Sequence, residues 1–547
     1  MKLKLIACIL FPFFVQAQTI KNTNKETIKT PKLVVGIVVD QMRSDYIARY
    51  WNKLSDNGFK RLVNNGFYCK NTNYNYVPTF TGPGHTSIYT GTTPASHGII
   101  ANEWYSRETG KMMYCTDDKT VKTIGSDSKA GLMSPKNMLA TTMGDELRIS
   151  SLKKSKVIGL ALKDRSSILP AGHSANAAYW FDGNLGGFIS SSHYMNELPK
   201  WVSDFNGKQT ARQYLQQGWT TLLPIEQYTE SLPDDNNYES APNKKDKPVF
   251  PYEYNEFIQK KDFDIIRSTP WGNTITKDFA LETLKAEQLG KDEYTDMLCI
   301  SFSATDYVGH SYGPKSIEIE DVYLRLDKDI AELLNGLDKE IGTDNYVLFL
   351  TADHGACDVP AHLKDMKIPG GYINHSKMAK ELKAYLNQVY GDTLVLSYSN
   401  QQVFLNDAGI AAKKLDKMQV EKTCAEFMLK YDGVGETYTT ESLRTQEYGE
   451  GAFRHLVQKG YNFKRSGDVS VCFQPAWMEF GEKGTSHGAE FSYDTHVPLL
   501  FYGAGIPQGS TVRSIHIVDI APSICMLLNI PFPDACSGKP IEELFRK

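Results

Sequence analysis

The sequence predicts an α/β fold, an αβα sandwich in which helices cover a mainly parallel central sheet that also carries cap insertions. Two observations predict it. Short apolar runs rich in β-branched residues alternate with amphipathic stretches, and three of the runs lead directly into acidic or histidine residues. We expect buried parallel strands at residues 33–39, 157–162, 297–302, 346–350 and 497–502. Ligands bind at the carboxyl ends of such strands, so the functional side chains are expected along one edge.

The stretches between these runs predict helices and two insertions. Ser134-Pro135 is typical of a helix start, and we expect that helix to continue to Leu147. Residues 317–334 carry apolar side chains at helical spacing. Residues 166–271 and 391–483 do not show this alternation of strands and helices. The second stretch nevertheless contains candidate hairpin strands over 394–405 and a candidate helix near 411–431. We interpret both as insertions that cap the edge of a single domain, residues 18–547.

The composition is that of an ordinary globular chain. Of the 547 residues, 41% are apolar and 23% are charged, which argues against a disordered or fibrous protein. The net charge is −4, and there is no basic block that could neutralise a row of nucleic-acid phosphates. We therefore expect no nucleic-acid partner. A monomer is favoured, although the composition does not specify the oligomeric state.

The first residues are typical of a secretory signal. Lys2 and Lys4 precede an apolar run over 5–15, and cleavage is expected after Ala17, so that residues 1–17 are the signal peptide. This run is too short to span a bilayer, and no later run approaches the roughly 18 apolar residues of a membrane helix. Cys8 offers a lipoprotein alternative, but almost no apolar segment would precede it. We expect a secreted or periplasmic protein without stable membrane insertion.

The cysteines predict disulfides without assigning them. Eight remain after Cys8, and none belongs to a CxxC pair: Cys69, Cys115, Cys299, Cys357, Cys424, Cys472, Cys525 and Cys536. An even number in an oxidising compartment permits disulfides, but the pairing does not follow from the sequence. Cys525 with Cys536 is the local candidate.

Acidic and imidazole side chains at the strand ends predict a metal site. The candidate ligands are Asp40, Thr81, Asp306, His310, Asp353, His354 and His487. Three carboxylates, three imidazoles and a hydroxyl without thiolate suit Zn²⁺, whereas Mn²⁺ and Fe are less favoured. Seven ligands are too many for one tetrahedral ion, so we expect two metals. Asp306 and His310 are four residues apart, which points both at one ion on a helical turn.

Each candidate also has an ordinary explanation, because strand-end aspartates often cap helices and most histidines are not ligands. The combination of several such residues favours the metal site. His375 and His496 compete with His487 for the third imidazole position, and His496 directly precedes a predicted strand. We expect structural, surface or local hydrogen-bonding roles for His85, His97, His173, His193, His362, His455 and His516.

Residues 78–87 predict a turn that leads into a helix. The segment contains Thr81-Gly82-Pro83-Gly84, and the N–H groups at the start of such a helix can bind an anion. A metal-bound hydroxyl there loses its proton more easily than a free threonine. Thr81 is therefore the predicted nucleophile, with Thr79 and a simple helix-capping role for Thr81 as the alternatives.

Taken together, the motifs resemble the alkaline phosphatase superfamily. They are Asp40, TFTGPGH around Thr81, HGI at 97–99 with Asn102, DYVGHSYGP from Asp306, TADHG from Thr351 and SHG at 486–488. Their order and spacing are most similar to the PafA-type bacterial alkaline phosphatases, a phosphate-monoesterase branch near the nucleotide pyrophosphatase/phosphodiesterases. The resemblance covers residues 33–528.

The resemblance implies a ligand set and a reaction. Asp306, His310 and His487 would hold one zinc, and Asp40, Thr81, Asp353 and His354 would hold the other. A phosphate monoester would transfer its phosphoryl group to Thr81, and hydrolysis of the phosphothreonine would release inorganic phosphate. Asn102 and the Thr81 N–H would hold a phosphoryl oxygen.

Charge favours monoesters over diesters. Three carboxylates and a Thr81 alkoxide balance two divalent ions, which leaves Lys163 and Arg165 to meet the two charges of a bound monoester. The resemblance implies the same role for this pair, and a solvated strand end is the alternative. A phosphodiesterase or nucleotide pyrophosphatase of the same superfamily is the main rival. A sulfatase is disfavoured because the nucleophile segment lacks the Cys or Ser followed by x-Pro-x-Arg, and a noncatalytic scaffold is disfavoured by the complete ligand set.

Overall fold

The computed structural model describes residues 30–241 and 247–546. The predicted signal peptide and Cys8 lie outside these residues. Within them, eleven strands form one central sheet. In spatial order the strands are β18 (Gly509–Thr511), β2 (Phe67–Asn73), β17 (His496–Gly503), β10 (Tyr346–Thr351), β1 (Leu33–Val39), β9 (Asp296–Phe302), β6 (Val157–Ala161), β7 (Ala177–Asp182), β8 (Gly187–Ser191) and β5 (Thr123–Ile124), with β19 (Ile515–His516) also paired to β2.

The middle of the sheet is parallel, as the sequence predicts. Strands β10, β1, β9, β6 and β7 run in one direction, and every residue of β1 is buried because helices cover both faces. The prediction that residues 497–502 form a parallel strand is wrong. Strand β17 pairs antiparallel with both β10 and β2, and a continuous apolar run does not encode strand direction.

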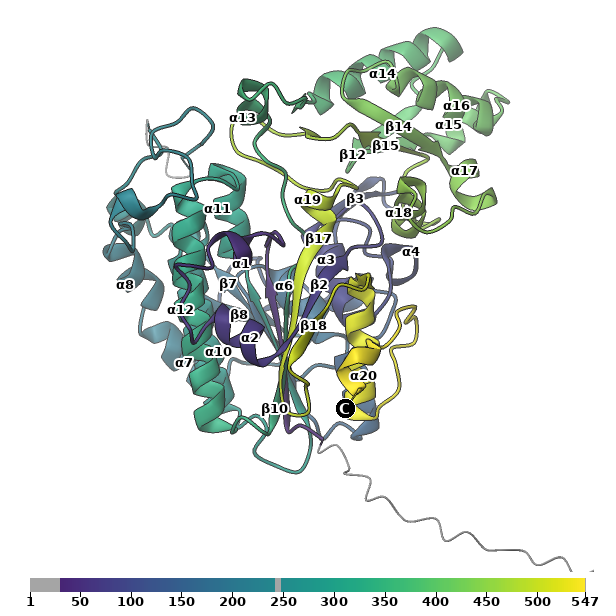
Figure 1. The fold of residues 1–547 in the computed structure, drawn as a ribbon. Helices are drawn as coiled ribbons and strands as arrows, with labels where there is room; N and C mark the ends of the chain where they lie inside the picture. Colours follow the sequence, from purple (N-terminus) through teal and green to yellow (C-terminus); the bar gives the residue numbers. More distant parts are fainter. Residues whose placement is uncertain (1–29, 242–246, 547) are drawn as a thin grey trace, which may run out of the picture.

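Helices pack on both sides of this sheet (Figure 1). The larger ones are α3 (Thr81–Thr90), α5 (Met143–Ser150), α6 (Asp164–Ala171), α10 (Trp271–Ala286), α11 (Ala304–Tyr312), α12 (Ile317–Glu340) and α20 (Ile520–Leu528). α10 and α12 pack together on one side, and α20 packs with α3 and α5 on the other. The helix predicted over 317–334 is therefore confirmed and continues to Glu340.

The helix predicted from Ser134 to Leu147 is interrupted. Pro135–Asn137 forms a single 3₁₀ turn, and the α-helix begins only after Thr142. The Thr142 side chain accepts from the Asp145 N–H while the Asp145 carboxylate accepts from the Thr142 N–H. The α-helix therefore begins at this capping box and not at Pro135, where the sequence predicted its start.

The stretch 166–271 is only partly an insertion. Strands β7 and β8 and most of α6 fall within it, and they extend the central sheet instead of capping its edge. Their buried apolar side chains explain why they join the core. The remaining helices are α7 (Lys200–Gly207), α8 (Thr210–Gln216) and α9 (Asn255–Lys260), with 3₁₀ turns at Ile225–Gln227 and Phe263–Ser268.

Most of the second stretch, residues 391–483, belongs to a lobe with its own hydrophobic core (upper right in Figure 1). We define this lobe as residues 371–478. Its four-stranded sheet has the order β12 (Val395–Ser399), β13 (Gln402–Leu405), β15 (Val469–Phe473) and β14 (Val434–Thr439). The predicted hairpin is present. Its helices are α14 (His375–Tyr390), α15 (Asp407–Ala412), α16 (Lys417–Met428), α17 (Thr440–Thr445) and α18 (Phe453–Gly460).

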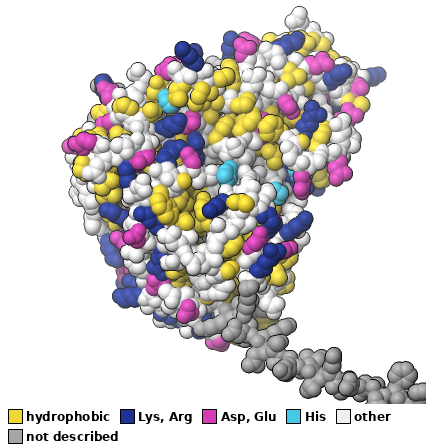
Figure 2. Space-filling view, viewed as in Figure 1, with side chains coloured by type: hydrophobic (Ala, Val, Ile, Leu, Met, Phe, Trp, Pro, Cys, Tyr) yellow, Lys and Arg dark blue, Asp and Glu magenta, His cyan; other side chains and the backbone are white. Residues whose placement is uncertain are grey.

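Short elements complete the description. They are α1 (Tyr46–Arg49), α2 (Phe59–Asn65), α4 (Pro94–His97), α13 (Pro360–Asp365), α19 (Ser492–Thr495), the hairpin β3 (Glu103–Ser106) with β4 (Lys111–Tyr114), the pair β11 (Gly371–Tyr372) with β16 (Trp477–Met478), and 3₁₀ turns at Ile517–Asp519 and Glu542–Phe545. Among residues 30–241 and 247–546, no helix is both long and apolar enough to cross a membrane. Figure 2 shows acidic and basic side chains interspersed over the visible face.

The expected Cys525–Cys536 disulfide is not formed in the structure. All eight described cysteines are free thiols, and all except Cys536 are buried. The seven buried cysteines belong to several separate apolar clusters, where a cysteine packs as a small hydrophobic side chain.

Candidate active site

The predicted carboxylate and imidazole ligands meet at the carboxyl ends of β1, β9 and β10. Asp40 directly follows β1, and Asp353 and His354 follow β10. Helix α11 begins two residues after β9 and carries Asp306 and His310 one turn apart, while His487 lies in the loop before α19. Because β1 lies between β10 and β9 in the sheet, residues far apart in sequence converge on one edge.

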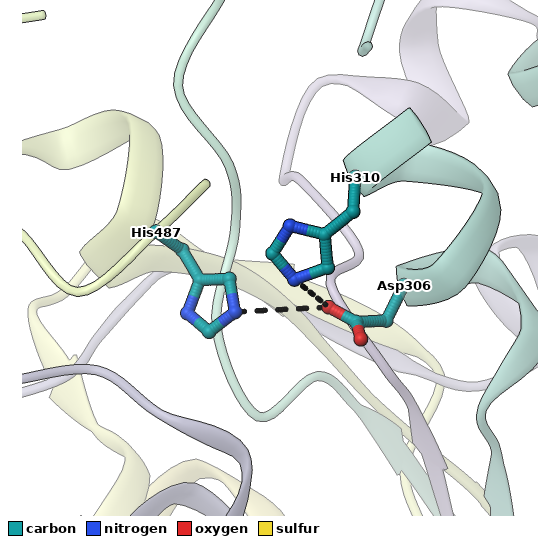
Figure 3. A group of neighbouring side chains, drawn as sticks. All are labelled: Asp306, His310 and His487. Carbon is teal, nitrogen blue, oxygen red and sulfur yellow. Dashed lines mark ion pairs between the residues drawn. The ribbon is translucent and has the colours of Figure 1, made fainter. Parts of the chain in front are cut away.

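Asp306, His310 and His487 form the first ligand group (Figure 3). Oδ1 of Asp306 lies 3.2 Å from Nε2 of His310 and 3.7 Å from Nε2 of His487. Figure 3 shows a nitrogen of each ring turned toward this carboxylate oxygen. One carboxylate and two imidazoles can hold a tetrahedral zinc ion with a position left for water or substrate.

Asp40, Asp353 and His354 form the second ligand group. Nε2 of His354 lies 3.6 Å from Oδ1 of Asp40 and 3.4 Å from Oδ2 of Asp353. All three of these atoms are buried, and none has a hydrogen-bond partner. Buried polar atoms without partners are costly, so their convergence fits a cation held between them. Asp306 also approaches Asp40 and His354, which makes the two ligand groups adjacent.

Backbone carbonyl groups orient the three histidines. Each Nδ1 lies within hydrogen-bond distance of a carbonyl oxygen, which can only accept. Each Nδ1 is therefore assigned the proton, and each Nε2 keeps its lone pair for a metal. The partners of His310, His354 and His487 are the carbonyl oxygens of Thr485, Gly355 and Thr79, at 2.7, 3.0 and 2.7 Å.

The pKa shifts in the first group differ from residue to residue. Against the effect of burial, Asp306 raises the pKa of His310. Burial alone would raise the pKa of Asp306, but Lys163 and His310 outweigh it and hold that pKa well below its usual value. Burial, reinforced by His354 and His310, lowers the pKa of His487. An ionised carboxylate and a neutral imidazole are the forms that bind metal.

Lys163 lies between the carboxylates of the two groups. Its Nζ donates to Oδ2 of Asp40 at 2.7 Å and to Oδ2 of Asp306 at 2.6 Å. Burial alone would lower the pKa of Lys163, but Asp306 and Asp40 outweigh it and raise that pKa. Arg165 is on the first turn of α6, and its Nη1 donates to the Tyr114 hydroxyl at 2.8 Å.

Thr81 is the first residue of α3 and is buried. Its carbonyl oxygen lies 2.9 Å from Nδ1 of His85, and the next N–H, of Gly82, donates to Oδ1 of Asn102 at 2.7 Å. The structure thus brings Asn102 to the start of the helix that carries Thr81. The hydroxyl of Thr79 instead faces the carbonyl oxygen of Ala489 at 3.5 Å.

The competing histidines lie outside both ligand groups. Both ring nitrogens of His496 face other partners, the Ser44 hydroxyl at 3.1 Å and the Lys70 carbonyl oxygen at 3.0 Å. His375 begins α14 in the lobe. His85 is buried beside the site and hydrogen-bonds the Thr81 carbonyl oxygen through Nδ1 and the Ser301 hydroxyl through Nε2, each at 2.9 Å, in keeping with a local hydrogen-bonding role.

Sequence reasoning missed Gln41, Tyr114 and Asp494, which contact the predicted site residues or the loops that carry them. Gln41 directly follows Asp40, and this adjacency to a strand end was the only sequence signal. Tyr114 lies 51 residues from Arg165, and nothing in the spacing indicates their contact.

Comparison with known proteins identifies the family. The type I phosphodiesterase / nucleotide pyrophosphatase family model matches residues 34–496. The chain is 45% identical to a Myroides odoratus protein named calcium-transporting ATPase (98% of this chain, 97% of that protein). It is 44% identical to alkaline phosphatase PafA of Elizabethkingia meningoseptica (94% and 95%) and 42% identical to alkaline phosphatase PhoV of Synechococcus elongatus (100% of each).

A solved structure agrees with these relatives. The crystal structure of wild-type alkaline phosphatase PafA superposes with a TM-score of 0.92 at 44% identity, covering 95% of this chain and all of that one. The fold, the strand-end ligand groups and the family match all describe the same region of the chain. The protein belongs to the type I phosphodiesterase / nucleotide pyrophosphatase family.

Proposed function

We propose that the protein is a metal-dependent alkaline phosphatase that hydrolyses phosphate monoesters. The observation that carries the proposal is the convergence of Nε2 of His354 with oxygens of Asp40 and Asp353, all buried and without hydrogen-bond partners, beside the first ligand group. The names of two close relatives support the choice of reaction.

Two zinc ions fit the donor set better than manganese or iron, because the donors combine imidazole nitrogen with carboxylate oxygen. The first ligand group would hold one ion, and the second ligand group with the Thr81 hydroxyl would hold the other. When bound, two such ions lower the pKa of coordinated hydroxyl groups and stabilise charge on the attacking and leaving oxygens.

Thr81 is the proposed nucleophile. Its Oγ would attack phosphorus, forming phosphothreonine and releasing the alcohol, and water would then cleave the phosphothreonine to give inorganic phosphate. The start of α3 offers backbone N–H groups to phosphoryl oxygens. Because Oδ1 of Asn102 accepts from Gly82, the NH₂ of this side chain remains available as a further donor.

Lys163 and Arg165 favour a dianionic substrate. Lys163 uses two of its three N–H donors on Asp40 and Asp306, which leaves the third for a phosphoryl oxygen. Arg165 makes one hydrogen bond to Tyr114, and its Nε is buried without a partner. The buried Lys163 and the partly buried Arg165 match the two charges of a monoester better than the single charge of a diester.

A phosphodiesterase is the second candidate, because the family description includes that activity. The two are separated by comparing kcat/KM for an aryl phosphate with that for its methyl ester. We expect the monoester to be preferred, and we expect Arg165→Ala to lower its kcat/KM by about 100-fold or more, with a smaller effect on the diester. An equal loss of kcat/KM on the monoester and the diester in Arg165→Ala would favour the phosphodiesterase.

The decisive experiment uses a chromogenic aryl phosphate. Activity should disappear on chelation and return with added zinc, and Thr81→Ala should lower kcat by about 10⁴-fold. Thr79→Ala is the matched control, and it should retain activity because Thr79 orients His487 through its backbone carbonyl. Activity that survives chelation, or a Thr81→Ala variant equal to wild type, would contradict the proposal.

We also propose export to the periplasm, which the signal-like first 17 residues support. N-terminal sequencing of the exported protein should begin at Gln18. An N-terminus at Met1 would contradict this.

A further inference from the structure

Gln41 has an unusual backbone conformation for its residue type. It directly follows Asp40, is 2% exposed, and has a φ of 62° in the left-handed region. Residues other than glycine adopt this region at an energetic cost, and they keep it where surrounding contacts determine the conformation.

The contacts of Gln41 reach both ligand groups. Its backbone N–H donates to Oδ1 of Asp353 at 3.0 Å, and its side-chain Nε2 donates to Oδ1 of Asp306 at 2.7 Å. Both hydrogen bonds are buried. Asp306 belongs to the first ligand group and Asp353 to the second, so one residue joins the carboxylates of the two.

Close packing fixes the side chain of Gln41 in this position. Its Oε1 lies against Gly309 of α11, where an added Cβ would come within 2.0 Å of that oxygen. The amide oxygen therefore faces the helix, and the NH₂ faces Asp306. This orientation is the one a carboxylate requires, because a carboxylate only accepts hydrogen bonds.

We propose that Gln41 is a positioning residue that holds Asp306 and Asp353 at a fixed separation, and thereby aligns the two ligand groups for a pair of zinc ions. It would act through these two carboxylates. The left-handed backbone aims its N–H at one carboxylate, and the amide reaches the other. This inference rests on the proposed two-metal function.

The test measures zinc affinity by competition with a chromophoric chelator, without substrate. Gln41→Met keeps the length and the backbone N–H but removes the side-chain donor, and Gln41→Gly also relieves the left-handed strain. Both should bind zinc about 10- to 100-fold more weakly than wild type. At saturating zinc, kcat should fall while KM changes little.

Gln288 provides a matched control. It is also a left-handed glutamine, with a φ of 52°, but it is exposed at the end of α10. Gln288→Met should bind zinc as wild type does. Wild-type zinc affinity in Gln41→Gly would overturn the proposal. Any loss of affinity in Gln41→Met would then result from backbone strain and not from the missing side-chain donor. A wild-type protein that binds zinc but hydrolyses no ester would contradict the proposed function alone, and the affinities would still decide the role of Gln41.

Asp494 hydrogen-bonds the loops that carry His354 and His487, and these contacts do not involve Gln41. Its Oδ2 accepts from the N–H groups of Gly488 and Ala489 at 2.8 and 2.7 Å, directly after His487. Its backbone oxygen accepts from the N–H of Gly355 at 2.7 Å, directly after His354. The rings of His354 and His487 are stacked with centroids 3.5 Å apart, so small shifts of either loop would separate them.

We infer that Asp494 is a second positioning residue, which keeps these two rings in place. Asp494→Ala should weaken zinc binding by about 10- to 100-fold. Asp494→Asn should restore most of the affinity, because its amide oxygen can still accept from both N–H groups. An alanine variant with wild-type zinc affinity, or an asparagine variant as weak as the alanine variant, would overturn this role.

Discussion

Among the described regions that bury carboxylates without a full set of hydrogen bonds, two differ clearly in their surroundings. One is the pair of ligand groups at the strand ends, and the other is formed by Glu239 and Glu318, the latter on the first turn of α12. Glu239 and Glu318 are 2% and 0% exposed, and each has one oxygen without a hydrogen-bond partner. The charge of Glu318 raises the pKa of Glu239, after the effect of burial.

The two regions differ in what faces the carboxylates. At the strand ends, three imidazole rings face the carboxylates, and the positive charge of Lys163 is the main cause of the low pKa of Asp306. Beside Glu318, the Tyr252 hydroxyl donates to Oε1 at 2.5 Å, and burial raises the pKa of Glu318 to about 8 and that of Glu239 to about 10. The oriented imidazoles therefore distinguish the two regions, and we propose a metal site only at the strand ends.

The largest expected effect comes from removing a carboxylate at the strand ends. Asp306→Ala should lose zinc affinity by more than about 100-fold, since even the loss of an outer partner costs about 10- to 100-fold. Activity should fall with it. Zinc content after dialysis and kcat/KM on an aryl phosphate are the measurements. Glu318→Gln is the control, and if it lost as much zinc as Asp306→Ala, the distinction between the two regions would be wrong.

The next largest effect is expected on the pH dependence of the free energy of unfolding, to which Glu318 contributes. Its pKa is about 8 in the folded protein against an ordinary value of 4.5, so folding favours the protonated form. The stabilisation is fully present below pH 4.5 and is lost as the pH rises through about 8. The free energy of unfolding of the wild type should therefore fall between about pH 5 and about pH 8.

Glu318→Gln tests this assignment, because it cannot titrate. Urea unfolding of this variant should show a smaller decline over that pH range than the wild type does. Glu108→Gln, at an exposed position, is the control and should behave as the wild type. A decline in Glu318→Gln equal to that of the wild type would show that the carboxyl group ionises normally.

The smallest expected effect concerns Tyr114. Its hydroxyl accepts from Arg165 and donates to Asp164 at 2.9 Å, much as Tyr252 donates to Glu318. Tyr114→Phe should lower kcat/KM for a monoester by about fivefold, the equivalent of one hydrogen bond of about 1 kcal/mol. Steady-state kinetics would measure it. Tyr105→Phe on the same hairpin is the control, and an equal loss there would indicate a change in the hairpin and not in Arg165.

Much of the fold follows from local patterns. The apolar runs at 33–39 and 346–350 are buried strands, because a strand covered on both faces needs a continuous apolar sequence. The helix after Ser134 was misplaced, because Pro135 starts only a 3₁₀ turn and the capping box at Thr142 starts the helix. Strands β7 and β8 were missed because their sequence resembles the polar, aromatic stretch around them.

The sequence also predicts one part of the candidate site and leaves another part unpredicted. Strand-end position and residue chemistry single out Asp40, Asp306 and Asp353, since a parallel sheet gathers its carboxyl ends at one edge. No local pattern predicts that Lys163 lies between two of these carboxylates, because that depends on the relative position of β6 and β1 across β9.

The sequence by itself determined the α/β class, the buried strands and the set of side chains able to bind metal, because burial periodicity and ligand chemistry are properties of short segments. The tertiary structure alone decided the antiparallel β17, the separate core of the lobe, and the contacts of Gln41 and Asp494. These depend on the packing of segments hundreds of residues apart, whose register and direction no local pattern specifies.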